Sequence, residues 1–445
     1  MTTATQRVAQ FVSGFELSSA PEAVFEKAKV TLLHDLGVAL AGHQSAGPAF
    51  ELAADIGRCE DGARLPVAGT RVTVEQAALA TGALMHARTQ DDTQLSVLTH
   101  LGCTVLPSLL ALGDRADTSG RSFLTAMVAG YEATSAIAAQ HAATSTKRGL
   151  RATSIYGPFG SAAACARLLG LTDEQTANAL GLAAAFGGGT NQTWVAGTQE
   201  WQYQVGSASR NGMIAALLAQ KGVSGAPDAL EGVMGHFAAF AGSSDGADEI
   251  GRELGSRWQI LDVTYKPFPI CAINQVPVTV LTDLVSRHDV GEHEVEAVTL
   301  RLSPAEAAYP GTDEHGPFTD VGGSLMSAPY CLAVAIRKRT VRLGDLRDFD
   351  DETLMSLVRR VEIVPDPELP ANSCRLSVRT GRGDFTAEYI ATPETFNWDR
   401  VETADRLSAI VDDMPFGKDR LDEFVDVVLD IENRPLRDLV TATIA

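Results

Sequence analysis

The segment at residues 266–272, which reads Lys-Pro-Phe-Pro-Ile-Cys-Ala, places a single amine in an apolar run that contains two prolines. Proline fixes its own φ and restricts the residue before it, so the backbone around Lys266 is predicted to be stiff and extended. A lysine held in this way is a candidate for a positioned cation. Upstream, residues 86–93 (HARTQDDT) and 99–102 (THLG) supply histidine, aspartate and threonine side chains. Together these regions predict an acid–base site for a small carboxylate.

His100 is the first candidate for a general base or acid, because the charge of histidine changes near neutral pH. It directly precedes a predicted helix, whose free N–H groups and partial positive charge attract carboxylates. The alternative is a capping or core histidine. Asp91 and Asp92 lie on the loop before it, where one carboxylate could stay ionised while the other orients a histidine. They could equally be surface charges.

Arg151 closes a basic stretch at residues 147–151 in an acidic protein and could clamp a carboxylate through two parallel hydrogen bonds. A solvated loop is an equal interpretation of Arg151. Ser154 and Tyr156 follow it at the start of another predicted helix. Cys271 could be a nucleophile, but a small buried hydrophobic role is favoured. The sequence has no phosphate-binding motif and no metal-ligand spacing, so we expect no cofactor and no metal.

Length and charge narrow the class of protein. A chain of 445 residues is too long for one ordinary core, so two domains are expected. The net charge of −20 argues against nucleic acid and anionic membranes as partners. No apolar run is long enough to span a bilayer, and the polar first residues lack a signal peptide. The six scattered cysteines fit a reduced, cytoplasmic protein.

Hydrophobic periodicity predicts a mostly α fold, in which a large all-helical domain carries an inserted smaller α+β lid domain. Helical patterns fill the first 240 or so residues, including a capping box at residues 19–22 and a helix at residues 211–221 that Trp201 precedes. Alternating patterns at 295–302, 360–364, 374–378 and 385–389 predict strands. The expected parts are residues 1–266, the lid at 267–395, and C-terminal helices at 396–445 that pack back on the first part.

Several motifs follow one another along nearly the whole chain. They are LHDLGVALAG at 33–42, DDT at 91–93, GYE at 130–132, KPFP at 266–269, YPG at 309–311 and GPF at 316–318. In this order and spacing the chain resembles the MmgE/PrpD family, which includes 2-methylcitrate dehydratases, cis-aconitate decarboxylases and an iminodisuccinate epimerase. The resemblance implies a helical domain with an α+β lid, a site between them, and a cofactor-free homodimer.

The resemblance also implies site residues. Thr93 and His100 match a threonine and a histidine of the decarboxylase members, and Lys266 matches the lysine of the KPFP motif. Four family positions carry other residues here: Thr89 in place of aspartate, Arg151 in place of histidine, Trp201 in place of lysine, and Cys271 in place of histidine. These replacements change the charge of the site and the number of groups in it that can give or take a proton. Trp201 suggests a substrate less polar than a tricarboxylate.

The expected reaction is proton abstraction next to a carboxylate by His100, with Lys266 stabilising the enolate that develops. The expected catalytic residues are His100, Lys266, Asp92, Thr93 and Tyr309. The expected substrate-binding residues are Arg151, Asp91, Trp201, Cys271, Ser154 and Tyr156. Loss of water would make the protein a hydratase/dehydratase. Epimerisation, decarboxylation and a catalytically inactive ligand-binding relative remain alternatives.

Overall fold

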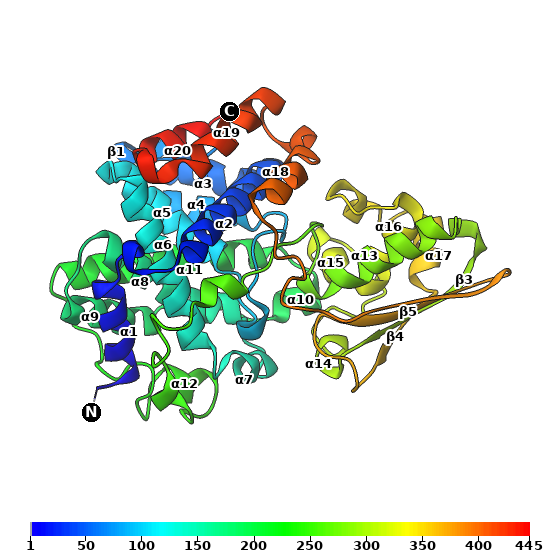
Figure 1. The fold of residues 1–445 in the computed structure, drawn as a ribbon, viewed down its shortest axis with the longest axis horizontal. Helices are drawn as coiled ribbons and strands as arrows, with labels where there is room; N and C mark the ends of the chain where they lie inside the picture. The colour runs from blue at the N-terminus through cyan, green and yellow to red at the C-terminus, as the bar shows by residue number, and fades with distance from the viewer. Residues whose placement is uncertain (1) are drawn as a thin grey trace.

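The computed structural model describes residues 2–445 and is mostly helical, with 58% helix and 11% strand. Figure 1 shows a large helical body that holds both ends of the chain, beside a smaller part built from a sheet and helices. The prediction of a mostly α fold is therefore confirmed. The limits of the domains and the role of the smaller part as a lid stay predictions.

The helical body is built around α8, which packs against α6 and α11, while α11 also packs against α4. A Cβ added at Gly82 of α4 would lie 2.5 Å from the Cα of Gly206 in α11, so two glycines let these helices touch. This contact fixes the end of α4, from which the site loop departs. The helices are α1 (Ala4–Gly14), α2 (Glu22–Ala41), α3 (Gly47–Gly57), α4 (Val74–Met85), α5 (Gly102–Ala116), α6 (Gly120–Ala138), α7 (Ala142–Lys147), α8 (Ala152–Leu168), α9 (Asp173–Ala184), α10 (Gln192–Ala196), α11 (Glu200–Gln220) and α12 (His236–Phe240).

Three C-terminal helices, α18 (Arg400–Ser408), α19 (Lys418–Leu429) and α20 (Leu436–Ala442), complete this body. The first two contact α2, and α20 contacts α5. Buried side chains such as Leu407 and Phe424 belong to the same apolar core as the N-terminal helices. The two ends of the sequence therefore share one core, as the blue and red segments of Figure 1 show.

The smaller part contains a four-stranded sheet in the order β4-β3-β5-β6, in which β3 runs parallel to β4 and antiparallel to β5. Alternate residues of β3 are buried, and two of them, Val298 and Leu300, pair with the buried Val378 and Leu376 of β5. Helices cover one face, because α13 contacts β5 and β6 and α16 contacts β4. The elements are β3 (Val295–Leu302), β4 (Val361–Pro365), β5 (Cys374–Thr380), β6 (Gly383–Tyr389), α13 (Ala272–Arg287), α14 (Pro304–Ala307), α15 (Val321–Met326), α16 (Ala328–Lys338) and α17 (Glu352–Val358).

All four predicted strands are confirmed, but some details of the helical predictions are wrong. The capping box at residues 19–22 does not form: α2 starts after Pro21 without a side-chain cap. Trp201 does not precede its helix but lies in the first turn of α11. A short hairpin of β1 (Arg58–Arg64) and β2 (Arg71–Val72) was not expected, since its charged first strand lacks a clear alternation.

No helix within residues 2–445 is both long enough and apolar enough to cross a lipid bilayer.

Candidate functional site

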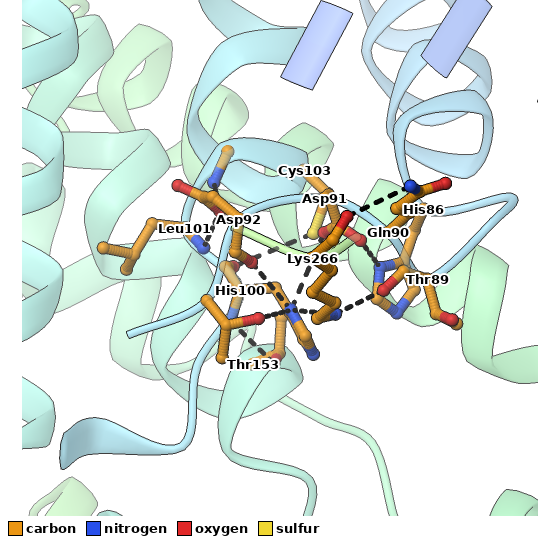
Figure 2. A network of polar contacts seen from close by, with 12 residues as sticks. His86, Thr89, Gln90, Asp91, Asp92, His100, Leu101, Cys103, Thr153 and Lys266 are labelled. Atoms are coloured by element: carbon orange, nitrogen blue, oxygen red, sulfur yellow. Dashed lines mark hydrogen bonds and ion pairs between the residues drawn. The ribbon is translucent and has the colours of Figure 1, made fainter. Parts of the chain in front are cut away.

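The candidate site forms where the loop between α4 and α5 meets the segment that carries Lys266. Thr93 and Thr264 exchange two main-chain hydrogen bonds, each 2.9 Å long, so the two segments run side by side for one residue pair. The side-chain Nε2 of Gln90 also donates to the Lys266 carbonyl oxygen at 3.0 Å. These contacts bring together residues that are far apart in the sequence, as Figure 2 shows.

The His100 ring is oriented by the loop that precedes it. Its Nδ1 lies 2.9 Å from the Asp92 carbonyl oxygen and 3.1 Å from Thr93 Oγ1. A carbonyl oxygen can only accept, so hydrogen bonding assigns the proton to Nδ1. Nε2 then carries the lone pair, and it has no hydrogen-bond partner within residues 2–445. The ring therefore presents an unengaged basic nitrogen.

His100 is held in its neutral form. Burial lowers the pKa of His100 well below its ordinary value, and the nearby Lys266 ammonium lowers it further. Its side chain is still 19% exposed, whereas the neighbouring Asp91 is fully buried. A neutral imidazole with one accessible nitrogen is suited to accept a proton from a bound molecule.

Lys266 approaches the ring from the opposite segment. Its Nζ donates to the Thr89 carbonyl oxygen and lies 3.4 Å from His100 Nδ1. Thr89 has a φ of 51°, an uncommon conformation for a β-branched residue, in the short turn that ends with its carbonyl against the amine. Burial lowers the pKa of Lys266, although the Asp91 carboxylate opposes this effect. The side chain is 2% exposed, so the structure provides a dry, positioned cation.

Behind His100, a chain of buried polar groups connects Asp91 to Arg151. The guanidinium Nη2 of Arg151 lies 2.6 Å from His86 Nε2, and His86 Nδ1 lies 2.8 Å from Asp91 Oδ1. Because arginine can only donate, His86 must accept at Nε2 and donate from Nδ1. Burial lowers the pKa of His86 to about 4, so the ring is neutral. Arg151 thereby determines which hydrogen His86 presents to Asp91.

Asp91 and Asp92 have different environments although they are adjacent. Burial tends to raise the pKa of Asp91, but His86, His100 and Lys266 outweigh it and bring the net pKa below its ordinary value. Burial raises the pKa of Asp92 to about 6. Asp92 Oδ1 accepts hydrogen bonds from the amides of Leu101 and Gly102 at 3.1 and 2.9 Å, at the start of α5. Asp91 is thus the ionised carboxylate, and Asp92 is a structural anchor for the loop.

Two tryptophans line the site on the side of Arg151. The Trp201 carbonyl oxygen accepts from Arg151 Nη1 at 2.6 Å, and the Trp201 ring lies 5.3 Å from His86. The Arg151 guanidinium also lies over the Trp194 ring at 5.0 Å, in cation–π geometry. Both tryptophans pack in the core of the smaller part, although they precede residue 266. The site wall is therefore shared between the two parts of the molecule.

Of the remaining predicted residues, some lie next to Arg151 and one makes its contacts elsewhere. Ser154 Oγ donates to Gln204 Oε1 at 3.1 Å, and the same oxygen accepts from Arg151, so Ser154 supports the arginine. Tyr309 is partly buried, and burial raises its pKa. Cys271 raises this pKa further, whereas Arg151 lowers it. The Tyr156 hydroxyl instead pairs with Ser145 at 2.9 Å and makes no hydrogen bond to the site cluster.

Cys271 caps the start of α13, where its amide donates to the Leu325 carbonyl oxygen at 3.1 Å. Burial raises the pKa of its thiol, which keeps the sulfur protonated and unreactive. Lys266 opposes this shift, so the thiol lies within electrostatic reach of the amine. These observations place Cys271 near the site as a wall residue rather than as a nucleophile.

One group of buried side chains has the composition of a metal site. Ligand atoms of His86, Asp91 and Cys103 lie within 4.8 Å of one another. However, both nitrogens of His86 are engaged, and burial holds the pKa of Cys103 well above its ordinary value. The cationic groups of Arg151 and Lys266 next to the trio oppose a divalent cation. These residues therefore fit a metal poorly.

Sequence reasoning missed two residues of this network. His86 was visible only as part of the segment at residues 86–93, and its spacing to Arg151 gave no signal. Asp35 lies in the middle of α2, buried, and its Oδ1 accepts the Asp92 amide hydrogen at 2.8 Å. Asp35 lies inside the LHDLGVALAG motif, and an acidic residue within that mostly apolar stretch is a signal that could have indicated it.

Comparison with known proteins agrees with this arrangement. Residues 6–247 match the MmgE/PrpD N-terminal domain, and residues 268–409 match the MmgE/PrpD C-terminal domain. The fold and the site thus define a two-part helical protein with a polar site next to the segment that joins the matched regions. The chain belongs to the MmgE/PrpD family.

Its relatives include proteins with a named activity. It is 27% identical over 422 residues to the cis-aconitate decarboxylase-like protein oryM of Aspergillus oryzae, covering 88% of this chain and 87% of that protein. It is 26% identical over 404 residues to a cis-aconitate decarboxylase of Aspergillus terreus, with 86% and 82% covered. The human cis-aconitate decarboxylase is 28% identical over 278 residues, with 60% and 56% covered.

Proposed function

We propose that this protein is a cofactor-independent lyase that removes a proton from the carbon next to a carboxylate of a small hydroxy acid and then eliminates water. The observation that carries this proposal is the His100 ring. Its Nδ1 is bound to the Asp92 carbonyl oxygen, its Nε2 is free, and an ammonium group lies 3.4 Å from Nδ1. A neutral base beside a buried cation is the combination that proton abstraction next to a carboxylate requires.

The proposed step conserves atoms and electrons in a simple way. His100 Nε2 takes the proton, and the C–H electron pair is delocalised into the neighbouring carboxylate. Lys266 Nζ faces the negative charge that develops on those oxygens, in a site where little water screens it. The electron pair then forms a C=C bond as the C–OH bond breaks, and the departing hydroxide takes a proton from Lys266 or Tyr309 to leave as water.

Decarboxylation is the second candidate, and the relatives favour it, since each bears the name of a cis-aconitate decarboxylase or a decarboxylase-like protein. In that reaction a C–C bond breaks, carbon dioxide leaves, and the electron pair left on the carbon takes a proton from Lys266 or Tyr309, the donors named above for the departing hydroxide. Lys266 would have the same role in both reactions. The two candidates therefore share a site and differ in the product.

The smaller part is proposed to act as a lid. Arg151 and Lys266 are at most 4% exposed, so a substrate cannot reach them without a local opening. The tryptophans beside Arg151 pack in the core of the smaller part. A movement of that part could carry Trp194, whose helix α10 contacts α15, away from Arg151, and it would uncover the Trp201 ring, which stays on α11 in the helical body. The wall would then open, and closure would exclude water from the reaction.

The test is proton NMR in D₂O with the protein and a panel of citrate, 2-methylcitrate, cis-aconitate, malate and tartrate. Exchange of one proton with a new vinyl signal supports elimination. Loss of one carbon as carbon dioxide selects decarboxylation. His100→Gln should abolish exchange, while His141→Gln, at a buried histidine without a hydrogen-bond partner in the described chain, should not. Exchange that persists in His100→Gln would refute the assigned base.

A further inference from the structure

Asp35 lies in α2 with its side chain completely buried, and it makes two hydrogen bonds. Its Oδ1 accepts from the Asp92 amide at 2.8 Å, and its Oδ2 accepts from the Tyr131 hydroxyl at 3.2 Å. The proposed reaction does not use it, because it has no contact with His100 or Lys266. A buried carboxyl group is costly to keep, so its contacts need a structural explanation.

Asp92 connects Asp35 to the base through three different groups of one residue. Its amide donates to Asp35, its side chain accepts from the amides of Leu101 and Gly102, and its carbonyl oxygen faces His100 Nδ1 at 2.9 Å. The amide and the carbonyl oxygen flank one Cα, so a shift of the amide displaces the carbonyl oxygen. The position of this oxygen therefore depends on the acceptor that Asp35 provides.

The surroundings leave Asp35 little freedom to move. A Cβ added at Gly102 would lie 1.8 Å from Asp35 Oδ2, so the carboxyl group rests directly on the start of α5. Tyr131 from α6 closes the other side and is itself fully buried. The Asp35 side chain, which extends from α2, is thus enclosed by α5 and α6, and this makes it a rigid acceptor for the Asp92 amide.

The alternative state of His100 already has a partner in place. Lys266 Nζ lies 3.4 Å from Nδ1, and an ammonium group can only donate. If the Asp92 carbonyl oxygen moved away, Nδ1 would become the acceptor of this hydrogen and the ring proton would move to Nε2. In that tautomer the nitrogen that faces away from the loop can no longer accept a proton. Thr93 Oγ1 also lies 3.1 Å from Nδ1, but a hydroxyl can donate as well as accept. The group that can only accept from Nδ1, and that therefore selects the Nδ1–H tautomer, is the Asp92 carbonyl oxygen.

We propose that Asp35 is a positioning residue for His100: by accepting the Asp92 amide hydrogen, it fixes the carbonyl oxygen that keeps the His100 proton on Nδ1. This inference rests on the proposed function of His100 as a base. Asp35 would thus control which nitrogen of the His100 ring is basic, although it contacts neither the ring nor the substrate and acts through Asp92.

Histidine-labelled protein and long-range ring ¹H–¹⁵N NMR test the inference without turnover, with the His100→Gln spectrum assigning the His100 signals. Wild-type protein should show the Nδ1–H tautomer, and Asp35→Ala should shift His100 toward Nε2–H. Asp35→Asn keeps an oxygen acceptor and should preserve the wild-type tautomer. Where cis-aconitate or citrate exchanges a proton, Asp35→Ala should lower kcat by about 10- to 100-fold, with a smaller change in KM, as expected when a buried donor loses its acceptor.

Asp114→Ala is the matched control, because Asp114 is a buried aspartate that pairs with Arg64 at 2.6 Å, outside this network. It should lower the melting temperature and leave the His100 tautomer unchanged. A folded Asp35→Ala protein with the wild-type tautomer would overturn the inference, as would a folded Asp35→Asn protein in which the tautomer has changed. If Asp35→Ala does not fold, the Asp35→Asn spectrum still decides. Absence of exchange in wild-type protein would refute the proposed function alone, since the tautomer comparison does not depend on it.

Discussion

Replacing Lys266 by methionine removes the ammonium group that lies 3.4 Å from His100 Nδ1 while keeping an unbranched side chain of similar length. The relevant interaction is between the Lys266 ammonium group and the negative charge that develops on the substrate carboxylate. Two such unit charges about 4 Å apart interact by about 1 kcal/mol in water and about 4 kcal/mol at an effective dielectric constant near 20. Lys266 is 2% exposed, so the larger figure applies more closely. Since about 1.4 kcal/mol corresponds to a tenfold change in rate, Lys266→Met should slow proton exchange by about 10- to 1,000-fold.

The assay is the initial rate of deuterium incorporation into the compound of the panel that wild-type protein exchanges fastest, measured across pH. Lys266→Met should also raise the pKa of His100, because the ammonium group is among the causes that lower it. Lys29→Met is the matched control: Lys29 is also buried, but it pairs with Glu26 and Glu432 away from the site. An exchange rate for Lys266→Met equal to that of Lys29→Met would refute the assigned role of Lys266.

Two further predictions concern stability. Glu132 accepts from the amides of Gln259 and Ile260, and burial raises its pKa from 4.5 to about 7. Between these values the folded state holds a proton on Glu132 that the unfolded state has lost. The stability that protonated Glu132 contributes is therefore complete below pH 4.5 and is lost as the pH rises through 7. Glu132→Gln should flatten the decline in melting temperature between pH 5 and 8, and an unchanged slope would contradict the assignment. Gly102→Ala should lower the free energy of unfolding by about 1–3 kcal/mol, because its Cβ would overlap Asp35 Oδ2. Urea titration measures this loss, part of which Asp35→Ala should relieve in the double variant; equal stability of Gly102→Ala and wild type would be inconsistent with the packing described.

The sheet was predictable from the sequence because its two central strands, β3 and β5, alternate between buried and more exposed residues. Residues 295–302 alternate clearly, and β3 occupies those residues. The start of α11 was missed because Trp201 and its polar neighbours lack an apolar stripe, and tertiary packing stabilises that turn instead. The hairpin of β1 and β2 was missed for a similar reason, since its first strand is largely charged.

The site was predictable in part. Local chemistry and the family resemblance together indicated His100, Lys266 and Arg151, and the structure places all three around one polar network. The partner of each group could not be read from the sequence, because it depends on how distant segments meet. Arg151 was expected to hold a carboxylate, yet its guanidinium is already engaged by His86 and the Trp201 carbonyl oxygen. Pairing of this kind follows from tertiary structure alone.

The two tryptophans of the site wall bear on how this protein folds and how it can be divided. Trp194 and Trp201 complete the core of the smaller part, yet both precede it in the sequence, and α11, which carries Trp201, packs against α4 and α8 of the helical body. A fragment of residues 267–395 would lack both rings and expose the apolar surface that they cover. During synthesis, Trp201 leaves the ribosome more than a hundred residues before β5 and β6 exist. During synthesis, the two aromatic side chains of the first part therefore remain without their packing partners until the later strands and helices of the smaller part have been made.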